Sequence, residues 1–93
     1  MIKTFADKAT ELLFCEGNAK GIPRSVWARA VRKLDMVDNA MDVTDLRVPP
    51  GNRLRAFQGD KVGYYSISIN DQWRIVFRFE GEDAYDVAIC DYH

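Results

Sequence analysis

The sequence predicts an α+β fold in which two N-terminal helices pack on one face of an antiparallel β-meander. Apolar residues recur every three or four positions before residue 42, which is the period of a helix. From residue 53 onward apolar and polar residues alternate, which is the period of a strand. Only short turns separate the alternating segments, and short links join antiparallel neighbours. A chain of 93 residues is therefore expected to form one domain, residues 1–93.

The first elements are a short strand and a helix. Ile2–Phe5 is expected to be a short N-terminal edge strand. Asp7 is a typical helix N-cap, because its side chain can accept hydrogen bonds from free backbone N–H groups. Gly17 should end this first helix, since glycine readily adopts the left-handed conformation of a helix terminus.

A second helix is expected from Pro23 to about Ala40, because proline suits a first helical turn. Asp42–Leu46 is expected to add one further helical turn. The predicted apolar face of the second helix consists of Trp27, Ala30, Val31, Leu34, Val37 and Met41. Its other sides carry Arg24, Arg29, Arg32, Lys33 and Asp35. This basic side is either a solvated helix surface, which we favour, or a contact for a partner.

Four strands should follow the proline-rich loop Arg47–Asn52, and alternation assigns each side chain to a face. The expected strands are Arg53–Phe57, Val62–Ile69, Trp73–Phe79 and Ala84–Asp91. The apolar face should contain Tyr65, Ile67, Ile69, Trp73, Ile75, Phe77, Phe79, Tyr85, Val87 and Ile89. The two helices are the elements able to cover this face.

The opposite face of the sheet is polar, and no remaining element is expected to cover it. It should contain Arg53, Arg55, Tyr64, Ser66, Ser68, Arg74, Arg78, Asp86, Cys90 and Tyr92. Guanidinium groups suit phosphate oxygens, and aromatic rings suit unstacked bases. This open face therefore favours either single-stranded RNA binding or an ordinary solvated surface. The net charge of −1 requires an RNA-binding role to depend on cations gathered on one face.

Composition excludes several other classes of protein. Cys15 and Cys90 are expected to be reduced packing residues, because no export signal accompanies them. The absence of a CxxC motif and the single histidine do not favour a zinc site, so no metal or cofactor is expected. No apolar run is long enough to cross a membrane and no signal sequence begins the chain, which predicts a cytoplasmic protein.

Several segments together resemble the HigB toxins, which belong to the RelE superfamily of type II toxin–antitoxin systems. The segments are Pro49–Leu54, Gly59–Gly63, Ser66–Phe77 with its Asn-Asp-Gln-Trp-Arg run, and the terminal Asp91-Tyr92-His93. The resemblance implies a metal-independent endoribonuclease that cuts messenger RNA in the ribosomal A site and so inhibits translation and growth. It also implies an antitoxin with a helix-turn-helix that neutralises the toxin. Operator DNA would be bound only through the complex with this antitoxin.

The resemblance also implies roles for particular residues. Arg74 matches a functional arginine of the family, so we expect it to stabilise the phosphate or the transition state. Tyr92 and His93 match functional C-terminal positions, and one of them is expected to take part in proton transfer. The residues expected to bind RNA are Arg53, Arg55, Lys61, Tyr64 and Arg78.

The first strand of the open face departs from the family pattern. Some relatives carry a histidine and a lysine there, whereas this chain has Arg55 and Gln58, neither of which is an ordinary general base. This departure from the family pattern predicts a slow enzyme with weak toxicity. Two alternatives stay open, a non-catalytic module that binds RNA or the ribosome, and an interaction protein whose sheet is covered by an antitoxin.

Overall fold

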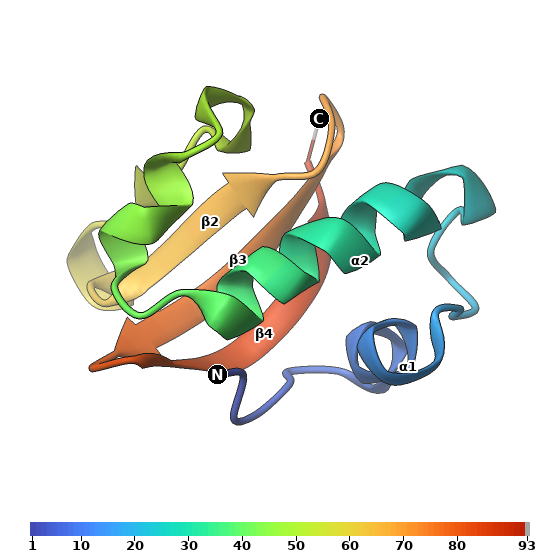
Figure 1. Cartoon of the computed structure of the whole chain (residues 1–93), viewed down its shortest axis with the longest axis horizontal. Helices are drawn as coiled ribbons and strands as arrows, with labels where there is room; N and C mark the ends of the chain where they lie inside the picture. Colours follow the sequence, from blue (N-terminus) through green and yellow to red (C-terminus); the bar gives the residue numbers. More distant parts are fainter. Residues whose placement is uncertain (93) are drawn as a thin grey trace.

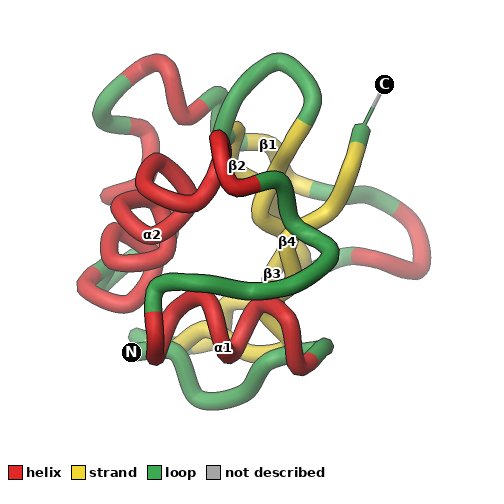
Figure 2. The backbone as a smooth tube through the Cα atoms, turned by 90° about the vertical axis from the view of Figure 1, so that its right-hand side faces the viewer, coloured by secondary structure: helices red, strands yellow, loops and turns green. Residues whose placement is uncertain are grey.

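The structure, a computed structural model that describes residues 1–92, places a layer of two helices against a four-stranded sheet (Figure 1). The helices are α1 (Lys8–Glu16) and α2 (Arg24–Asn39). The strands are β1 (Arg55–Ala56), β2 (Tyr64–Ser68), β3 (Trp73–Glu80) and β4 (Asp83–Asp91), in the spatial order β1-β2-β3-β4 with every pair antiparallel. Both helices lie on the same side of the sheet (Figure 2), as the sequence predicts.

The helix termini follow the predicted capping residues. Asp7 is the N-cap of α1, and its carboxylate accepts a 2.8 Å hydrogen bond from the backbone N–H of Thr10. Gly17 ends α1 with a φ of 81°, which is the left-handed conformation. The segment Val43–Arg47 is a 3-10 helix that Asp42 caps, close to the predicted helical turn. Met41 was assigned wrongly to the apolar face of α2, because the helix ends at Asn39 and the Met41 side chain is 64% exposed.

The core lies between the helices and the predicted apolar face of the sheet. From the sheet it receives Ile67, Ile69, Ile75, Phe77, Phe79, Ala84, Val87 and Ile89. From the helices it receives Leu13, Val26, Ala30, Leu34 and Val37. Burial of each large apolar side chain stabilises the fold by roughly 1.5–3 kcal/mol, so this interface accounts for the helix-on-sheet arrangement.

A β-bulge in β4 corrects the predicted position of Tyr85. The register between β3 and β4 shifts between Val76 and Arg78, and Asp86 has a φ of 54°. The extra residue reverses the alternation, so Tyr85 lies opposite Arg78 on the open face and not in the core. The Arg78 guanidinium lies 4.5 Å from the centre of the Tyr85 ring. A single-residue bulge leaves no signal in a pattern of period two, which explains the error.

The edges of the sheet are shorter than predicted. The first strand contains two residues because Arg53 adopts a left-handed φ of 48° and cannot extend it. At the opposite edge, Ile2 and Phe5 form isolated parallel bridges to Ala84 and Val87 of β4, so the N-terminal segment borders the sheet without forming a continuous strand.

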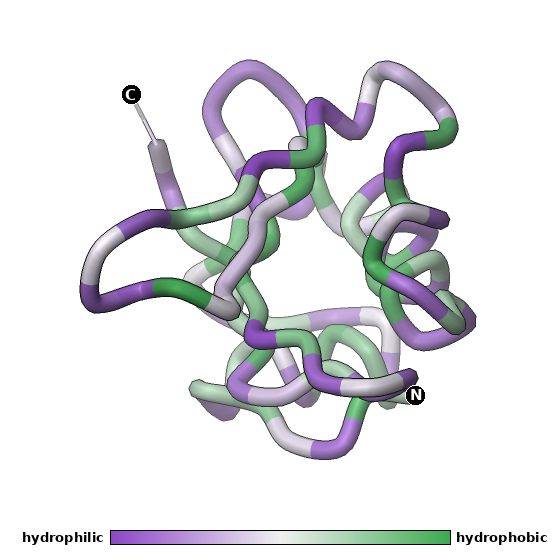
Figure 3. The backbone as a smooth tube through the Cα atoms, turned by 90° about the vertical axis from the view of Figure 1, so that its left-hand side faces the viewer, coloured by the Kyte–Doolittle hydropathy of each residue, from purple (hydrophilic) through white to green (hydrophobic). Residues whose placement is uncertain are grey.

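Two further observations concern the surface. Both cysteines are free thiols, as predicted, but Cys15 is exposed, so the prediction that it is a packing residue was wrong. Hydrophilic residues occur in the helices as well as in the loops, and the end of β4 lies on the opposite side of the molecule from α2 (Figure 3). Among residues 1–92 we find no helix with the length and apolar character needed to cross a membrane.

Candidate functional site

A cleft of about 280 Å³ lies at the end of the open face, where the turn between β2 and β3 meets the end of β4. Its lining residues are Arg53, Arg55, Ser68, Asn70, Asp71, Arg74 and Tyr92. Four residues that the sequence predicted for the site, Arg53, Arg55, Arg74 and Tyr92, are thus brought together. His93, the third predicted catalytic residue, lies outside the described residues.

Arg74 lies at the bottom of this cleft and is held in a fixed orientation. Its Nε donates a 2.9 Å hydrogen bond to Ser66 Oγ, and its Nη2 donates a 2.7 Å bond to the Arg53 carbonyl and a 3.3 Å bond to the Ser66 carbonyl. Only 8% of its surface is exposed. Within residues 1–92 no hydrogen bond uses its Nη1, so that end of the guanidinium group keeps its N–H donors for a ligand.

The polar face of the sheet is not fully uncovered, contrary to the expectation from the sequence. Ser66 and Ser68 are 2% and 6% exposed, so these two hydroxyls are buried on that face. The hydrogen bond from Arg74 to Arg53 ties the loop before β1 to the same part of the sheet. The open face is therefore accessible around the cleft, but covered in its centre.

A buried asparagine fixes the loop that carries Arg53. Asn52 is fully buried, and its amide donates to the carbonyls of Leu46 at 3.1 Å and Val48 at 3.4 Å. The same side chain accepts a hydrogen bond from Lys33 Nζ of α2. Because the Arg53 carbonyl follows directly in the chain, Asn52 links α2 to the acceptor that orients Arg74. Asn52 had no predicted role, although asparagine in a proline- and glycine-rich loop is a common sign of such a hydrogen-bonded turn.

Electrostatics at the cleft favour an anionic ligand. Burial lowers the pKa of Arg74, and the nearby positive charge of Arg55 lowers it further, while Tyr92 has the opposite effect and Arg53 adds to the lowering. Arginine stays protonated at neutral pH. The lowered pKa of Arg74 therefore indicates that its positive charge is partly buried and lies close to other positive charges. A phosphate group beside Arg74 would relieve this repulsion.

The turn between β2 and β3 gives the cleft its far wall. Asn70 Oδ1 accepts 2.8 Å hydrogen bonds from the backbone N–H groups of Gln72 and Trp73, and Ser68 Oγ donates to the Asn70 carbonyl. The backbone N–H of Tyr92 donates to the Gln72 carbonyl, which fixes the end of β4 beside this turn. Asp71 consequently contributes a carboxylate to the cleft. Neither Asn70 nor Asp71 had a predicted role, although both belong to the Asn-Asp-Gln-Trp-Arg run.

The other predicted RNA-binding residues form a separate group further along the sheet, around Arg78 of β3 and its partner Tyr64 of β2. Arg78 lies four residues from Arg74, which is roughly 13 Å along a strand. It pairs with Glu80 at 2.7 Å and with Asp86 at 3.7 Å. Desolvation opposes its charge, but the hydrogen bond and charge of Glu80 and the charge of Asp86 raise the pKa of Arg78 overall. Its positive charge is thus already compensated within the protein.

Tyr64 and Lys61 belong to this second group. The Tyr64 hydroxyl donates a 3.3 Å hydrogen bond to Asp86, and Lys61 Nζ lies 5.0 Å from the centre of the Tyr64 ring. Neither residue lines the cleft that holds Arg74. A ligand that touched both groups would have to extend along the sheet, as a single RNA strand can.

The cleft combines a fixed cation with groups that can exchange protons. The Tyr92 side chain is 42% exposed and Asp71 is exposed, so both are accessible to a ligand. Within residues 1–92, no three His, Cys, Asp or Glu side chains come together in an arrangement that could hold a metal ion. Charge stabilisation at phosphorus by Arg74, with proton transfer by neighbouring side chains, is the chemistry that this arrangement can support.

Comparison with known proteins gives concordant matches. Residues 3–93 match the model of a family described as RelE-like toxins of the type II toxin–antitoxin system HigB. The chain is 37% identical over its whole length to the endoribonuclease HigB of Proteus vulgaris, all of which is covered. It is 36% identical to the toxin HigB-1 of Vibrio cholerae over 85% of this chain and 84% of that protein. A solved structure of a YoeB dimer from Staphylococcus aureus matches 99% of this chain and 94% of that chain with a TM-score of 0.60 and 21% identity, which supports the fold.

Proposed function

Since the chain belongs to the RelE-like HigB toxins of type II toxin–antitoxin systems, we propose that it is an endoribonuclease that cleaves messenger RNA on the ribosome. The full-length similarity to an endoribonuclease of the same family supports an RNA-cleaving activity. Such an activity in the cytoplasm would stop translation and growth. As a toxin of this class the chain has a cognate antitoxin, and we propose that this antitoxin contains a helix-turn-helix through which the complex contacts operator DNA.

The single observation that carries the proposal is the orientation of Arg74. Three hydrogen bonds hold its guanidinium group on the floor of an open cleft, with the Nη1 donors directed to no other group among residues 1–92. A cation fixed before the substrate arrives needs no reorganisation as charge develops on phosphorus. Arg53 and Arg55 line the same cleft and would bind the flanking phosphates.

We propose that the RNA supplies the nucleophile. Its 2′-oxygen attacks the adjacent phosphorus, the bond from phosphorus to the 5′-oxygen breaks, and the products carry a 2′,3′-cyclic phosphate and a 5′-hydroxyl. One group must accept the proton of the 2′-hydroxyl and another must give a proton to the leaving 5′-oxygen. Tyr92 and Asp71 in the cleft, together with His93, are the candidates for these transfers. Arg74 would stabilise the charge on the pentavalent phosphorus.

Mapping of messenger RNA 5′ ends after expression of the chain tests the proposed activity in cells. We expect new 5′ ends within translated regions, and no new ends when translation initiation on the reporter message is blocked. Cuts that persist on an untranslated message would contradict dependence on the ribosome. Because Arg55 and Gln58 replace possible acid–base groups, growth inhibition should be weak at mild expression, and strong arrest would contradict a slow enzyme.

Replacement of Tyr92 with phenylalanine tests the proton-transfer role. The ring and its packing are kept while the hydroxyl is lost, so single-turnover cleavage should slow about 10²-fold with little change in RNA affinity. His93→Gln tests the terminal residue in the same way. Rates equal to wild type in both variants would remove the C-terminal side chains from the chemistry and leave Asp71 as the remaining candidate.

A non-catalytic module that binds RNA or the ribosome is the alternative that the accessible cationic cleft also suits. It would share the affinity for RNA but leave messages intact. An adjacent reading frame for a small helix-turn-helix protein would support a toxin without proving catalysis, whereas the 5′-end maps separate the two functions.

A further inference from the structure

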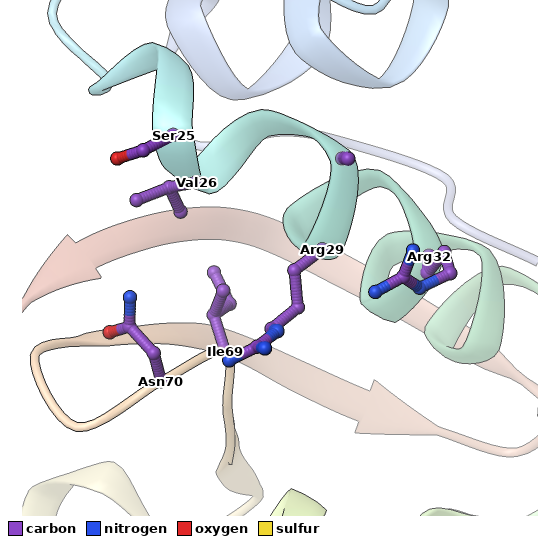
Figure 4. A pocket seen from close by; sticks show the side chains of 7 residues that line it. Ser25, Val26, Arg29, Arg32, Ile69 and Asn70 are labelled. Carbon is purple, nitrogen blue, oxygen red and sulfur yellow. The ribbon is translucent and has the colours of Figure 1, made fainter.

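A second cleft, of about 270 Å³, lies between α2 and the turn that joins β2 to β3 (Figure 4). Its lining residues are Ser25, Val26, Ala28, Arg29, Arg32, Ile69 and Asn70. The close-up shows Arg29 extending from α2 toward Ile69, with Asn70 on the opposing loop. The helix contributes cations and a hydroxyl to this cleft, and the sheet contributes an amide.

The two arginines of this cleft carry charge that the protein does not balance. Arg29 and Arg32 are exposed and lie three positions apart, which places them on one side of α2. Among residues 1–92 neither forms an ion pair, in contrast to Arg78 with its two carboxylates. Burial lowers the pKa of neighbouring Lys33, and the charges of Arg29 and Arg32 lower it further, which is the effect expected of unpaired cations.

Asn70 joins this second cleft to the one that holds Arg74, because it lines both. The two backbone N–H groups that bond to its Oδ1 fix the orientation of the amide. No hydrogen bond within residues 1–92 uses its Nδ2, so the amide N–H donors remain for a ligand. A strand that left the first cleft at the turn would therefore meet Asn70 first, and then the two arginines.

The size of the second cleft limits its ligand. Pockets that enclose a small molecule begin at roughly 300 Å³, so about 270 Å³ in an open cleft suits a phosphate with its sugar better than a complete cofactor. Guanidinium groups bind phosphate oxygens in pairs, and one amide and one hydroxyl donor at the rim add neutral contacts.

We infer that the Arg29–Arg32 cleft binds a phosphodiester group of the same RNA strand whose scissile phosphate lies beside Arg74. This inference rests on the proposed function and deepens it. The bound strand passes around the β2–β3 turn at Asn70 and continues onto α2. The cleft binds and orients RNA nucleotides away from the phosphodiester bond that is cleaved. It takes no part in the chemistry.

The test compares binding of two 2′-O-methyl RNA strands, which lack the nucleophile and cannot be cut, to wild type and to the double variant Arg29→Ala, Arg32→Ala. Strands of about 4 and about 12 nucleotides both fall within the usual site sizes of single-strand binders, and only the longer one can reach both clefts. For the longer strand, we expect the double variant to bind about tenfold more weakly. The slope of log affinity against log salt should fall by about 0.7, the value for one lost phosphate contact. The shorter strand should bind both proteins alike.

The matched control is the double variant Lys20→Ala, Arg24→Ala, which removes the same charge near the beginning of α2 without touching the cleft. It should bind both strands like wild type. An equal loss in this control, an equal loss for both strand lengths, or no loss in the Arg29–Arg32 variant would overturn the inference.

Three further outcomes distinguish a failure of this inference from a failure of the proposed function. If the Arg29–Arg32 variant binds RNA normally but loses affinity for the cognate antitoxin, the cleft serves a protein partner and the inference is wrong. If wild type neither binds RNA nor cuts messages on ribosomes, the proposed function fails and the inference fails with it. If wild type cuts messages but its RNA affinity is unchanged by the double substitution, only the inference fails.

Discussion

Replacement of Arg74 with alanine should lower the single-turnover rate of message cleavage on programmed ribosomes about 10²- to 10³-fold, the range for loss of one fixed transition-state donor. The guanidinium group is oriented by Ser66 and by the Arg53 carbonyl, so no neighbour can replace it. Arg74→Lys should recover little of the rate, because an ammonium group lacks the planar fork that reaches two acceptors at once.

Arg78→Ala is the matched control for this prediction. Arg78 occupies the same face of the same strand, but Glu80 and Asp86 already compensate its charge. Its loss should therefore reduce the rate less than about tenfold, since partly exposed ion pairs contribute little. Equal losses for Arg74→Ala and Arg78→Ala would show that the general field of the face matters and the fixed guanidinium does not.

Folding must be measured alongside these rates, because Arg74 is also part of the structure. Its removal leaves the Arg53 and Ser66 carbonyls without this donor and should cost about 1–2 kcal/mol of unfolding free energy. Thermal unfolding of each variant identifies the temperature range in which it is native, and rates are compared within that range.

Replacement of Asn52 with alanine should produce the largest loss of stability among the polar residues of the loops. The substitution leaves the Leu46 and Val48 carbonyls without their donor, and removes the acceptor for Lys33. Because Asn52 is fully buried and its hydrogen bond to Leu46 is buried as well, the substitution should lower the unfolding free energy by about 2–3 kcal/mol. For a domain of this size the melting temperature should fall by about 10 °C or more.

Asn39→Ala is the control for Asn52. The Asn39 side chain also donates to a carbonyl, that of Asp35 at 2.8 Å, but it is exposed and water can replace it. Its loss should change the unfolding free energy by less than about 0.5 kcal/mol. A small effect at both positions would contradict the view that Asn52 holds the loop. A large effect at Asn52 should be accompanied by slower cleavage in the native temperature range, since the loop presents the carbonyl that orients Arg74.

The periodicity of the sequence predicted most of the fold because burial follows it closely. Leu34 and Val37 on α2 and Ile75 and Phe77 on β3 are all fully buried, as their spacing indicated. Capping by Asp7 could also be predicted, because its side chain bonds to a backbone group only three residues away. The face on which Tyr85 lies could not be predicted, because it depends on the bulge at Asp86, which arises from the pairing of β4 with β3.

The sequence predicted which residue types form the candidate site, but not which of their charges are already paired within the protein. Alternation placed Arg74 and Arg78 on one face, and the resemblance favoured Arg74. Only the three-dimensional contacts separate the two: Arg74 is anchored by neutral oxygens, whereas Arg78 is paired with carboxylates. The hydrogen bond between Lys33 and Asn52 joins segments that are far apart in the chain, and so does the second cleft beside Arg29. A local sequence pattern cannot predict such contacts.

The most direct test of the account is single-turnover cleavage of a defined message on purified ribosomes, with chemical analysis of the ends produced. The account predicts cleavage by wild type to fragments with a 2′,3′-cyclic phosphate and a 5′-hydroxyl, and a loss of at least about 10²-fold with Arg74→Ala. An intact message with wild type, fragments that carry a 5′-phosphate, or full activity of the Arg74 variant would contradict it.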